Sequence, residues 1–281
     1  MQSKSILFLG FGDVARRTAA LLPECRRIGV ARSARTGLDG VEFWQGAADS
    51  LSVRQCLEHQ FFDAVVLTLT PTEYSPAAYE LSYVETLRTL LPIWRGNPPG
   101  LIVFVSSTSV YHQADGEWVD EQSPTHPAHF SGQTLLRAEE LLLDMGLSSC
   151  VVRFAGIYGP GRDFLLRQIR AGKGGSTDYT NRIHADDCAG VLAHLLQRHW
   201  RGEPLERLYL GCDSNPAPGI EVRRWLAERV GIEPNGLVPS VSERGGNKRC
   251  ANGRLLATGY EMQYPSYREG YGALLASGDV K

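Results

Sequence analysis

Short apolar runs alternate with segments of helical periodicity along the first half of the chain. The predicted strands are residues 6–9, 27–31, 41–45, 63–69 and 101–105. The fourth run is apolar almost without interruption, as is typical of a parallel strand covered on both faces. The pattern between the runs predicts helices at residues 51–59 and 76–94. This alternation predicts an α/β protein with a doubly wound parallel sheet and right-handed crossovers.

A glycine-rich turn follows the first apolar run. Gly10, Gly12 and Ala15 have the spacing G-x-G-x-x-A. In a dinucleotide-binding fold the first glycine permits a tight turn, the second lets a pyrophosphate approach the backbone, and the small third residue lets the helix pack close to the strand. The helix that begins near Asp13 and Val14 contributes N–H groups and a dipole that favour phosphate. We therefore predict a dinucleotide site at Gly10, Gly12, Asp13 and Val14 in preference to a plain glycine-rich turn.

The end of the second strand carries two arginines, Arg32 and Arg35, which flank Ser33. An acidic residue here would bind the ribose 2′-hydroxyl of NAD, whereas arginine suits the 2′-phosphate of NADP. No Asp or Glu occupies this strand end, so the pattern favours NADP over NAD; the alternative is a solvated basic loop. Asp49 follows the third strand, where such folds place a group near the adenine.

The composition and charge of the chain argue against several classes of protein and of site. The chain has 281 residues, of which 43% are hydrophobic and 21% charged, as in an ordinary globular protein. A formal net charge of −2 gives no reason to expect nucleic acid or an anionic membrane as a partner. We expect no signal peptide and no membrane span, because the apolar runs are too short. The six cysteines are scattered and His112, His126 and His129 lack ligand spacing, so we expect no disulfide framework, no metal site and a cytoplasmic location.

Three later segments are more specific. SSTSVY (residues 106–111), RFAGIYGPGR (residues 153–162) and NRIHADD (residues 181–187) follow the glycine fingerprint in this order. Together these motifs resemble the extended short-chain dehydrogenase/reductase family, the NAD-dependent epimerase/dehydratase group. The similarity covers nearly the whole chain.

The resemblance implies a domain plan and a set of cofactor contacts. It places the dinucleotide-binding Rossmann core in residues 1–160. Residues 161–281 would mix a C-terminal substrate lobe with returning core elements, the sixth and seventh strands being at about 150–154 and 207–210. The substrate in this family is commonly a nucleotide-linked sugar. Beyond the fingerprint, the cofactor contacts expected at the sheet edge are Thr70, Pro71, Ser106, Phe154 and Ile157.

The catalytic centre that the resemblance implies is incomplete. The family uses a Ser or Thr after the fifth strand, matched by Ser107, and a Tyr-x-x-x-Lys pair on the next helix. That lysine lowers the tyrosine pKa so that a phenolate can exchange a proton with a substrate hydroxyl. Here Ser131 and Leu135 take the two positions, and a shift by one residue gives no better match. The chain therefore resembles an atypical subgroup that lacks the dyad.

Other side chains are candidates for the missing proton chemistry and for substrate binding. Tyr158 is a candidate catalytic residue beside the cofactor, although without a lysine its pKa would stay near the usual value of about 10. His184 is either a proton switch or, as the family motif favours, a structural residue. A basic group follows the sixth strand and forms either a solvated helix face or an anchor for an anionic substrate. Its members are Arg162, Arg167, Arg170 and Lys173.

Two functions remain open at this point. The first is an NADP-dependent oxidoreductase or epimerase with a non-standard proton donor, acting on a small substrate. The second is a catalytically silent NADP(H)-binding sensor or scaffold, which the residues at positions 131 and 135 favour. The resemblance also implies that helices at residues 76–94 and 131–145 pair across a two-fold axis. The second of these segments offers Leu135, Leu136, Leu142 and Leu143, so we expect a homodimer with an isologous interface.

Overall fold

The computed structural model describes residues 3–34, 40–240 and 246–278. They form two compact units, and the chain passes between them several times. Unit 1 comprises residues 1–107, 130–153 and 189–209, and unit 2 comprises residues 108–129, 154–188 and 210–281. Residues 108–129 and 154–160, which fall within the expected Rossmann range, therefore belong to unit 2.

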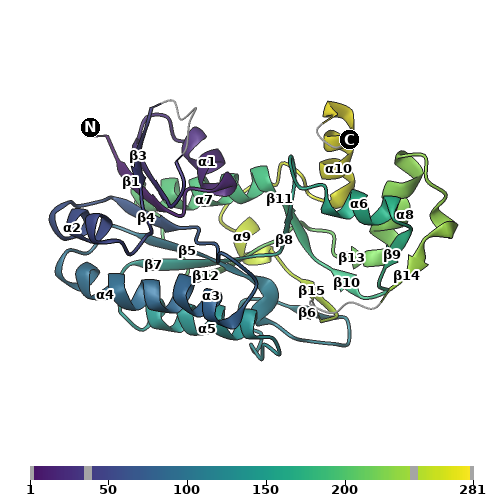
Figure 1. Ribbon diagram of the computed structural model, residues 1–281, viewed down its shortest axis with the longest axis horizontal. Helices are drawn as coiled ribbons and strands as arrows, with labels where there is room; N and C mark the ends of the chain where they lie inside the picture. The colour runs from purple at the N-terminus through teal and green to yellow at the C-terminus, as the bar shows by residue number, and fades with distance from the viewer. Residues whose placement is uncertain (1–2, 35–39, 241–245, 279–281) are drawn as a thin grey trace. The chain divides into compact units, whose positions relative to one another are not determined.

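The central element of unit 1 is a seven-stranded parallel sheet in the order β12-β7-β5-β4-β1-β2-β3 (Figure 1). The strands are β1 (Ser5–Leu9), β2 (Arg26–Ala31), β3 (Val41–Gln45), β4 (Ala64–Leu67), β5 (Ile102–Ser107), β7 (Ser149–Phe154) and β12 (Leu208–Gly211), the last two ending in unit 2. β1 pairs in parallel with both β2 and β4. The strand order reverses between β1 and β4, and doubly wound sheets bind ligands at such a switch point. The predicted fold class is confirmed.

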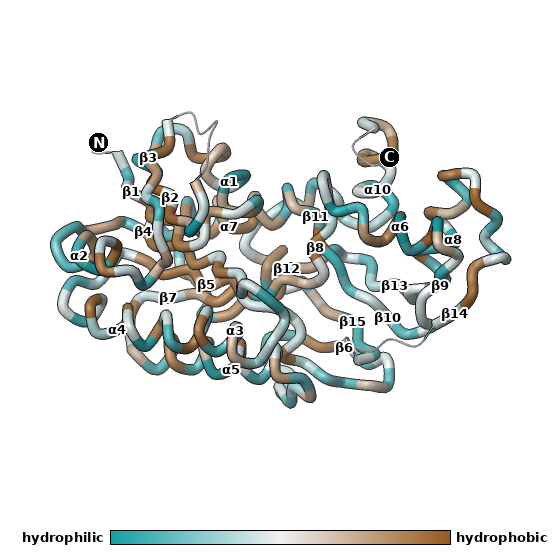
Figure 2. Tube along the Cα trace, viewed as in Figure 1, coloured by the Kyte–Doolittle hydropathy of each residue, from teal (hydrophilic) through white to brown (hydrophobic). Residues whose placement is uncertain are grey.

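The strands lie where the hydrophobic runs predict them, with small differences at the ends. The third predicted strand coincides with β3, whereas β4 is shorter than residues 63–69. Asp63 leaves the strand because its side chain accepts hydrogen bonds from the Ser5 amide and hydroxyl. At the other end Thr68 turns away as its hydroxyl donates to the Gly10 carbonyl. Figure 2 shows the hydrophobic colour concentrated along central strands such as β5.

Helices cover both faces of this sheet (Figure 1). On one side lie α3 (Pro76–Tyr79), α4 (Thr86–Gly96) and α5 (Phe130–Leu143), and on the other lie α1 (Asp13–Ala20) and α7 (Ala185–Trp200); α2 (Leu51–His59) contacts α4. The predicted helix at residues 76–94 is helical throughout, but its middle, η1 (Glu80–Glu85), is a π-helix. There the Thr86 hydroxyl donates to the Leu81 carbonyl five residues earlier, at 3.1 Å, which suits the wider turn.

Unit 2 is built from short two-stranded ladders and helices. Its parallel ladders are β6 (Glu117–Val119) with β15 (Lys248–Cys250), β8 (Gly156–Tyr158) with β11 (Arg182–His184), and β9 (Lys173–Gly175) with β14 (Val238–Pro239). β10 (Tyr179–Thr180) and β13 (Ala217–Pro218) form an antiparallel ladder. The helices include α6 (Phe164–Arg170), α8 (Gly219–Arg229), α9 (Gly253–Leu256) and α10 (Tyr267–Ser277).

The core of unit 2 joins α6, α8 and α10 through side chains that include Leu166, Leu226 and Tyr267. Across residues 3–34, 40–240 and 246–278, no helix combines the length and the apolar character needed to cross a membrane.

Candidate active site

A cavity of about 310 Å³ in unit 1 opens at the switch point of the sheet. Gly10 and Gly12 line it. Gly10 has φ +91°, and a Cβ there would lie 2.5 Å from the Thr68 carbonyl oxygen, so both conformation and space require glycine. A Cβ on Gly12 would meet no protein atom within 4 Å. The space beside Gly12 is therefore left to a ligand that approaches the backbone, as the fingerprint predicts.

The first turn of α1 completes this cradle. Its N-cap residue is Gly12, which has no side chain that could cap the helix. Asp13 pairs with Arg17 at 2.9 Å on the helix surface, and Val14 is buried. Neither of the two predicted residues lines the cavity with its side chain. If they bind phosphate, they do so through the backbone amides of the helix N-terminus.

The other end of the cavity carries Arg32, Ser33 and Asp49, three of the predicted residues. The Arg32 guanidinium donates to the Thr70 carbonyl at 3.2 Å, so it reaches from the end of β2 to the loop after β4. Thr70 also lines the cavity, whereas Pro71 does not. Arg35 lies outside the described residues.

The two serines at the end of β5 have different surroundings. Ser106 is buried and donates from its hydroxyl to Glu139 Oε1 at 2.5 Å, and Glu139 forms a buried ion pair with Arg153. Its side chain therefore points into the contact of α5 with the sheet, which leaves only its backbone for the predicted cofactor contact. Ser107, half-buried, ends the strand at the carboxyl edge of the sheet.

The α5 positions that the family resemblance assigns to tyrosine and lysine hold Ser131 and Leu135, and both are buried. The Ser131 hydroxyl lies 3.4 Å from the Tyr74 hydroxyl, which comes from the loop after β4. Leu135 belongs to the apolar core. This helix face therefore has no ammonium group to lower the pKa of a phenol.

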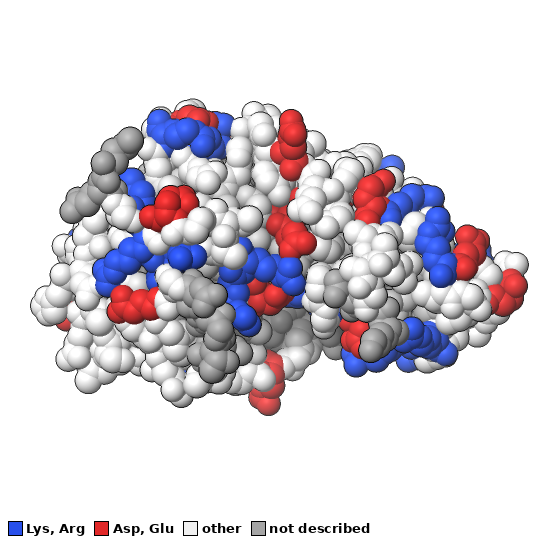
Figure 3. Space-filling model, turned by 90° about the horizontal axis from the view of Figure 1, so that it is seen from above, with Lys and Arg blue, Asp and Glu red and all other residues white. Residues whose placement is uncertain are grey.

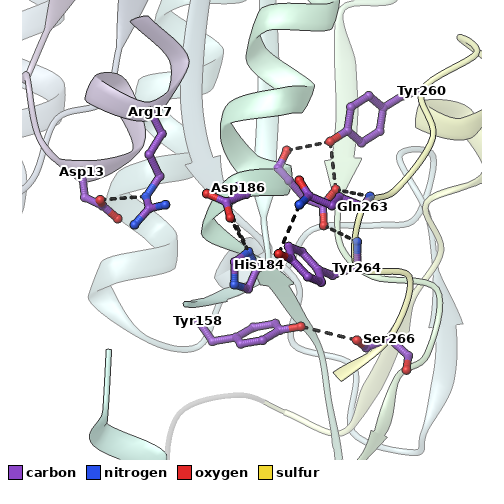
Figure 4. Close-up of polar contacts among 10 residues, drawn as sticks. Asp13, Arg17, Tyr158, His184, Asp186, Tyr260, Gln263, Tyr264 and Ser266 are labelled. Carbon is purple, nitrogen blue, oxygen red and sulfur yellow. Dashed lines mark hydrogen bonds and ion pairs between the residues drawn. The ribbon is translucent and has the colours of Figure 1, made fainter. Parts of the chain in front are cut away.

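Tyr158 lies in the core of unit 2, where burial governs its chemistry. Its ring stacks on Tyr271 at 4.4 Å, and its hydroxyl lies 3.5 Å from the Ser266 carbonyl oxygen (Figure 4). A Cβ on Gly270 would collide with this hydroxyl, so α10 needs glycine there. Burial, more than the neighbouring Asp213, raises the Tyr158 pKa above the usual value near 10 that we expected from the sequence. The phenol therefore stays protonated at neutral pH and is no base.

The NRIHADD segment holds the C-terminal tail (Figure 4). The His184 ring packs against Tyr264 at 4.1 Å, and its Nδ1 accepts a hydrogen bond from the Asp186 amide at 3.2 Å. The Asp187 carboxylate accepts hydrogen bonds from the Tyr260 hydroxyl and from the amides of the tail at Gln263 and Tyr264. These contacts support the structural interpretation of His184 over the proton switch.

A second cavity, of about 520 Å³, lies wholly within unit 2 and is rich in arginine. Four arginines line it, together with backbone and hydroxyl groups; they are Arg162, Arg167, Arg182 and Arg223. Figure 3 shows groups of Lys and Arg side chains over the part of this unit that carries α6 and α8. Arg182 is only 7% exposed, its Nη2 donates to the Thr180 hydroxyl, and its Nη1 has no hydrogen-bond partner among the described residues.

Comparisons with known proteins agree with this geometry. No model of a known protein family matches the chain. Protein YeeZ of Escherichia coli (strain K12) is 30% identical over 211 residues, which cover 72% of each chain. A solved structure from Methylobacillus flagellatus, of a protein assigned as an NAD-dependent epimerase/dehydratase, is 37% identical over 99% of both chains, with a TM-score of 0.81. The chain belongs to the NAD-dependent epimerase/dehydratase family.

More distant members of this fold are known with ligands. MoeE5, in complex with UDP-glucuronic acid and NAD, is 21% identical over 98% of each chain, with a TM-score of 0.79. The human epimerase family protein SDR39U1, isoform 2, with NADPH, is 18% identical over 97% of this chain and 99% of its own, with a TM-score of 0.76. At these identities the likeness shows the fold alone.

Within this epimerase/dehydratase fold, the structure adds site residues that sequence reasoning missed. Further cavity-lining residues in unit 1 are Phe11, Val30, Ala31, Gly46, Ala47, Ala48, Thr68, Leu69, Leu81, Ser82 and Thr86. The run of small residues after β3 was a usable signal, because small side chains leave room for a ligand. The Phe11 ring lies against Gly29 of β2, where a Cβ would come within 2.5 Å of it. No local pattern of the sequence predicts that contact.

Two predicted cofactor residues lie in unit 2. Ile157 lines the arginine-rich cavity there. The Phe154 ring is buried against Gly211 and lines neither cavity. Arg170 and Lys173 of the predicted basic group also lie outside the cavity lining, whereas Arg162 and Arg167 are part of it.

Proposed function

We propose that this protein is an NADP(H)-binding, atypical extended short-chain dehydrogenase/reductase that acts as an oxidoreductase or epimerase on a small anionic substrate. The observation that carries the proposal is the unit 1 cavity, which joins the glycine cradle of Gly10 and Gly12 to Arg32 and Ser33. An arginine at the end of β2, where NAD enzymes place an acidic residue, suits the additional 2′-phosphate. Since MoeE5 holds NAD and the human neighbour holds NADPH, the choice of NADP rests on this chain's own residues.

The residues present fit such a dinucleotide. Gly12 and the N-terminus of α1 suit the pyrophosphate, Arg32 and Ser33 the 2′-phosphate, and Asp49 the adenosine end. When bound, the dinucleotide would supply or accept the hydride. Ser107, at the carboxyl end of β5, would donate a hydrogen bond to the oxygen of the substrate carbon that reacts. Because α5 carries no phenol–lysine pair, turnover should be slow beside relatives that have one.

The substrate class is proposed from the arginine-rich cavity of unit 2. A buried guanidinium with an unsatisfied N–H is costly in the absence of a partner, so Arg182 favours an anionic group in the cavity. Arginine binds phosphate and carboxylate in a bidentate manner, which suits a nucleotide-sugar-like molecule. MoeE5 binds UDP-glucuronic acid, a compound of this class.

A second candidate function is a catalytically silent NADP(H)-binding sensor or scaffold. The observation that favours it is the helix face of α5, where Ser131 and Leu135 stand in place of the dyad. Both candidates require the dinucleotide cavity, so binding alone does not separate them.

The test combines binding with hydride transfer. NADPH labelled with deuterium at C4 is titrated into the protein by calorimetry, and the complex is then incubated with a UDP-linked 4-ketosugar and with a mixture of small anionic aldehydes and ketones, whose carbonyl carbons can accept the hydride. Binding followed by deuterium transfer to a product, absent with heat-inactivated protein, supports the enzyme. Binding with all deuterium retained on the dinucleotide favours the silent protein, and failure to bind NADPH contradicts both.

A further inference from the structure

The loop after β4 brings a tyrosine to the place where α5 lacks one. The Tyr74 hydroxyl lies 3.4 Å from the hydroxyl of Ser131, a weak hydrogen bond between residues 57 positions apart. Ser131 is the residue that stands in place of the family tyrosine. The chain therefore carries a phenol beside that position, presented by a different element.

Aromatic neighbours hold the Tyr74 ring. Its centroid lies 4.8 Å from that of Phe130 and 5.6 Å from that of Tyr79, the latter in an edge-to-face arrangement. The helical segment that follows the loop is tied to α5, because Glu80 at the start of η1 accepts hydrogen bonds from Arg137 with both carboxylate oxygens. Such paired aromatic rings and a bidentate ion pair favour one position of the loop on the helix.

The segment from the end of β4 to η1 contributes cavity-lining residues on both sides of Tyr74, from the loop before it and from η1 after it. Leu69 and Thr70 precede the tyrosine and line the cavity, and Leu81 and Ser82 follow it and line the cavity again. In a doubly wound sheet a dinucleotide lies across the switch point, with one half on each side. Because Arg32 and Asp49 mark the adenosine half at β2 and β3, the nicotinamide half belongs over the carboxyl ends of β4 and β5. Those strands lead into Tyr74 and end at Ser107, respectively.

We propose that Tyr74 is the catalytic proton donor of this protein and replaces the tyrosine that α5 lacks. The inference rests on the proposed NADP(H)-dependent activity. In the reductive direction Tyr74 would give its phenolic proton to the carbonyl oxygen of the substrate, while the dinucleotide held by Gly12 and Arg32 would supply the hydride for the carbonyl carbon. The nicotinamide C4–H bond, the C=O π bond and the phenol O–H bond would break, a C–H and an O–H bond would form on the substrate, the dinucleotide would be oxidised, and water would reprotonate the phenolate.

Exposure distinguishes Tyr74 from Tyr83, a neighbouring tyrosine of unit 1. Its side chain is 47% exposed, so the hydroxyl can meet a substrate and exchange protons with water. Tyr83 is buried and donates its hydroxyl to the Leu69 carbonyl, and burial raises its pKa far above the usual value. α5 carries no lysine, so the helix offers no ammonium group to hold a phenolate, and the role proposed for Tyr74 is that of a proton donor in reduction.

The first test is independent of any substrate. Protein with ¹³Cζ-labelled tyrosine is followed by NMR as the pH is raised. One sample is saturated with NADP⁺ and a second with NADPH. The resonance is assigned as the one missing from Tyr74→Phe. A positive nicotinamide ring near the phenol should place the Tyr74 midpoint at least about 0.5 pH units lower with NADP⁺ than with NADPH. Equal midpoints in two saturated samples would overturn the assignment of Tyr74 while leaving the proposed function standing.

The second test uses deuterium transfer from labelled NADPH. Tyr74→Phe should lower kcat about a hundredfold or more with KM and NADPH affinity nearly unchanged, since only the proton donor is lost. Tyr179→Phe is the matched control, because it removes a hydroxyl from a half-buried tyrosine that lines neither cavity, and it should keep the parent rate. A Tyr74→Phe variant as active as this control sinks the proposal, and a parent protein that binds no NADP(H) refutes the proposed function with it.

Discussion

Two buried carboxyl groups of this protein differ in how fully their oxygens are hydrogen-bonded. Glu139 in unit 1 meets the Arg153 guanidinium through several hydrogen bonds and accepts another from Ser106. Asp213 in unit 2 is 1% exposed, and its Oδ2 has no hydrogen-bond partner among the described residues. Burial raises the pKa of Asp213 to about 7, against the opposing effect of the Arg182 charge. A buried carboxyl with this pKa should gain or lose its proton near neutral pH.

The charge of Asp213 gives a prediction for stability. A carboxyl pKa raised from 3.8 to about 7 in the folded protein means that the native state holds a proton that the unfolded state releases. The free energy of unfolding should therefore be highest below about pH 4 and fall as the pH rises to about 7, by at most about 1.4 kcal/mol per pH unit from this group. Urea unfolding of the parent and of Asp213→Asn between pH 4 and 8 measures the contribution. The variant should lack this slope and be the more stable protein at pH 8; parallel profiles would contradict the prediction.

Arg32 determines cofactor choice in the proposed function. We expect NADPH to bind more tightly than NADH, and Arg32→Asp to reverse the order, because the charge-assisted contact with the 2′-phosphate is replaced by a carboxylate suited to a ribose hydroxyl. Loss of one such contact is worth about 1.5–3 kcal/mol, or roughly ten- to a hundredfold in affinity. Calorimetric titrations measure both constants, with Arg54→Asp on α2 as a control at a residue outside the cavity lining. Equal affinities of the parent for the two dinucleotides would contradict this expectation.

At the scale of elements, α5 carries much of the organisation of unit 1. The helix presents Ser131 and Leu135 on one buried stretch and Glu139 one turn later. Glu139 bonds to side chains of two strands, Ser106 on β5 and Arg153 on β7. The N-terminal end of the same helix holds Phe130 against Tyr74. One helix therefore anchors the sheet and also places the loop after β4.

The buried ion pair gives the corresponding prediction. Glu139→Gln leaves the Arg153 guanidinium buried without a counter-charge, so we expect a loss of about 3–5 kcal/mol in the free energy of unfolding. Glu140→Gln, at the exposed neighbouring position, should change it by less than about 0.5 kcal/mol. The double variant Glu139→Leu with Arg153→Met should recover part of the loss, because no charge remains buried. Denaturant unfolding measures all four proteins, and a Glu139→Gln variant as stable as the parent would contradict the argument.

At the scale of the whole molecule, the question is whether two copies associate. Leu135 and Leu142 of α5 are buried in their own unit, whereas Leu136 and Leu143 are half-buried. These side chains offer a modest apolar surface for the isologous pairing that we expect.

Light scattering at micromolar concentration tests this expectation. We predict about twice the monomer mass of 30.9 kDa, and a return to the monomer mass in Leu136→Glu, since a charge at the centre of an apolar contact is costly to bury. Leu256→Glu on α9 in unit 2 is the control and should leave the mass unchanged. A parent protein of monomer mass at every concentration would contradict the dimer.

Local patterns of the sequence determined most of the sheet and the dinucleotide cradle. The strand at residues 41–45 and the helix at 51–59 are where their apolar patterns place them, because backbone hydrogen bonding and burial act over a few residues. Gly10 and Gly12 were recognisable for the same reason, since a turn of special backbone geometry needs glycine at a fixed spacing.

Only the tertiary structure decided where side chains from distant segments meet. Tyr74 reaches Ser131 across 57 positions, and Ser106 turns its hydroxyl to Glu139 across 33. Tyr158 is buried against Tyr271, which alters its pKa as no neighbouring residue in the sequence could. Sequence spacing reports which residues share a strand or a helix, whereas a site depends on which ends of those elements packing brings together. The missing tyrosine was visible in the sequence; the tyrosine beside its position was visible only in the fold.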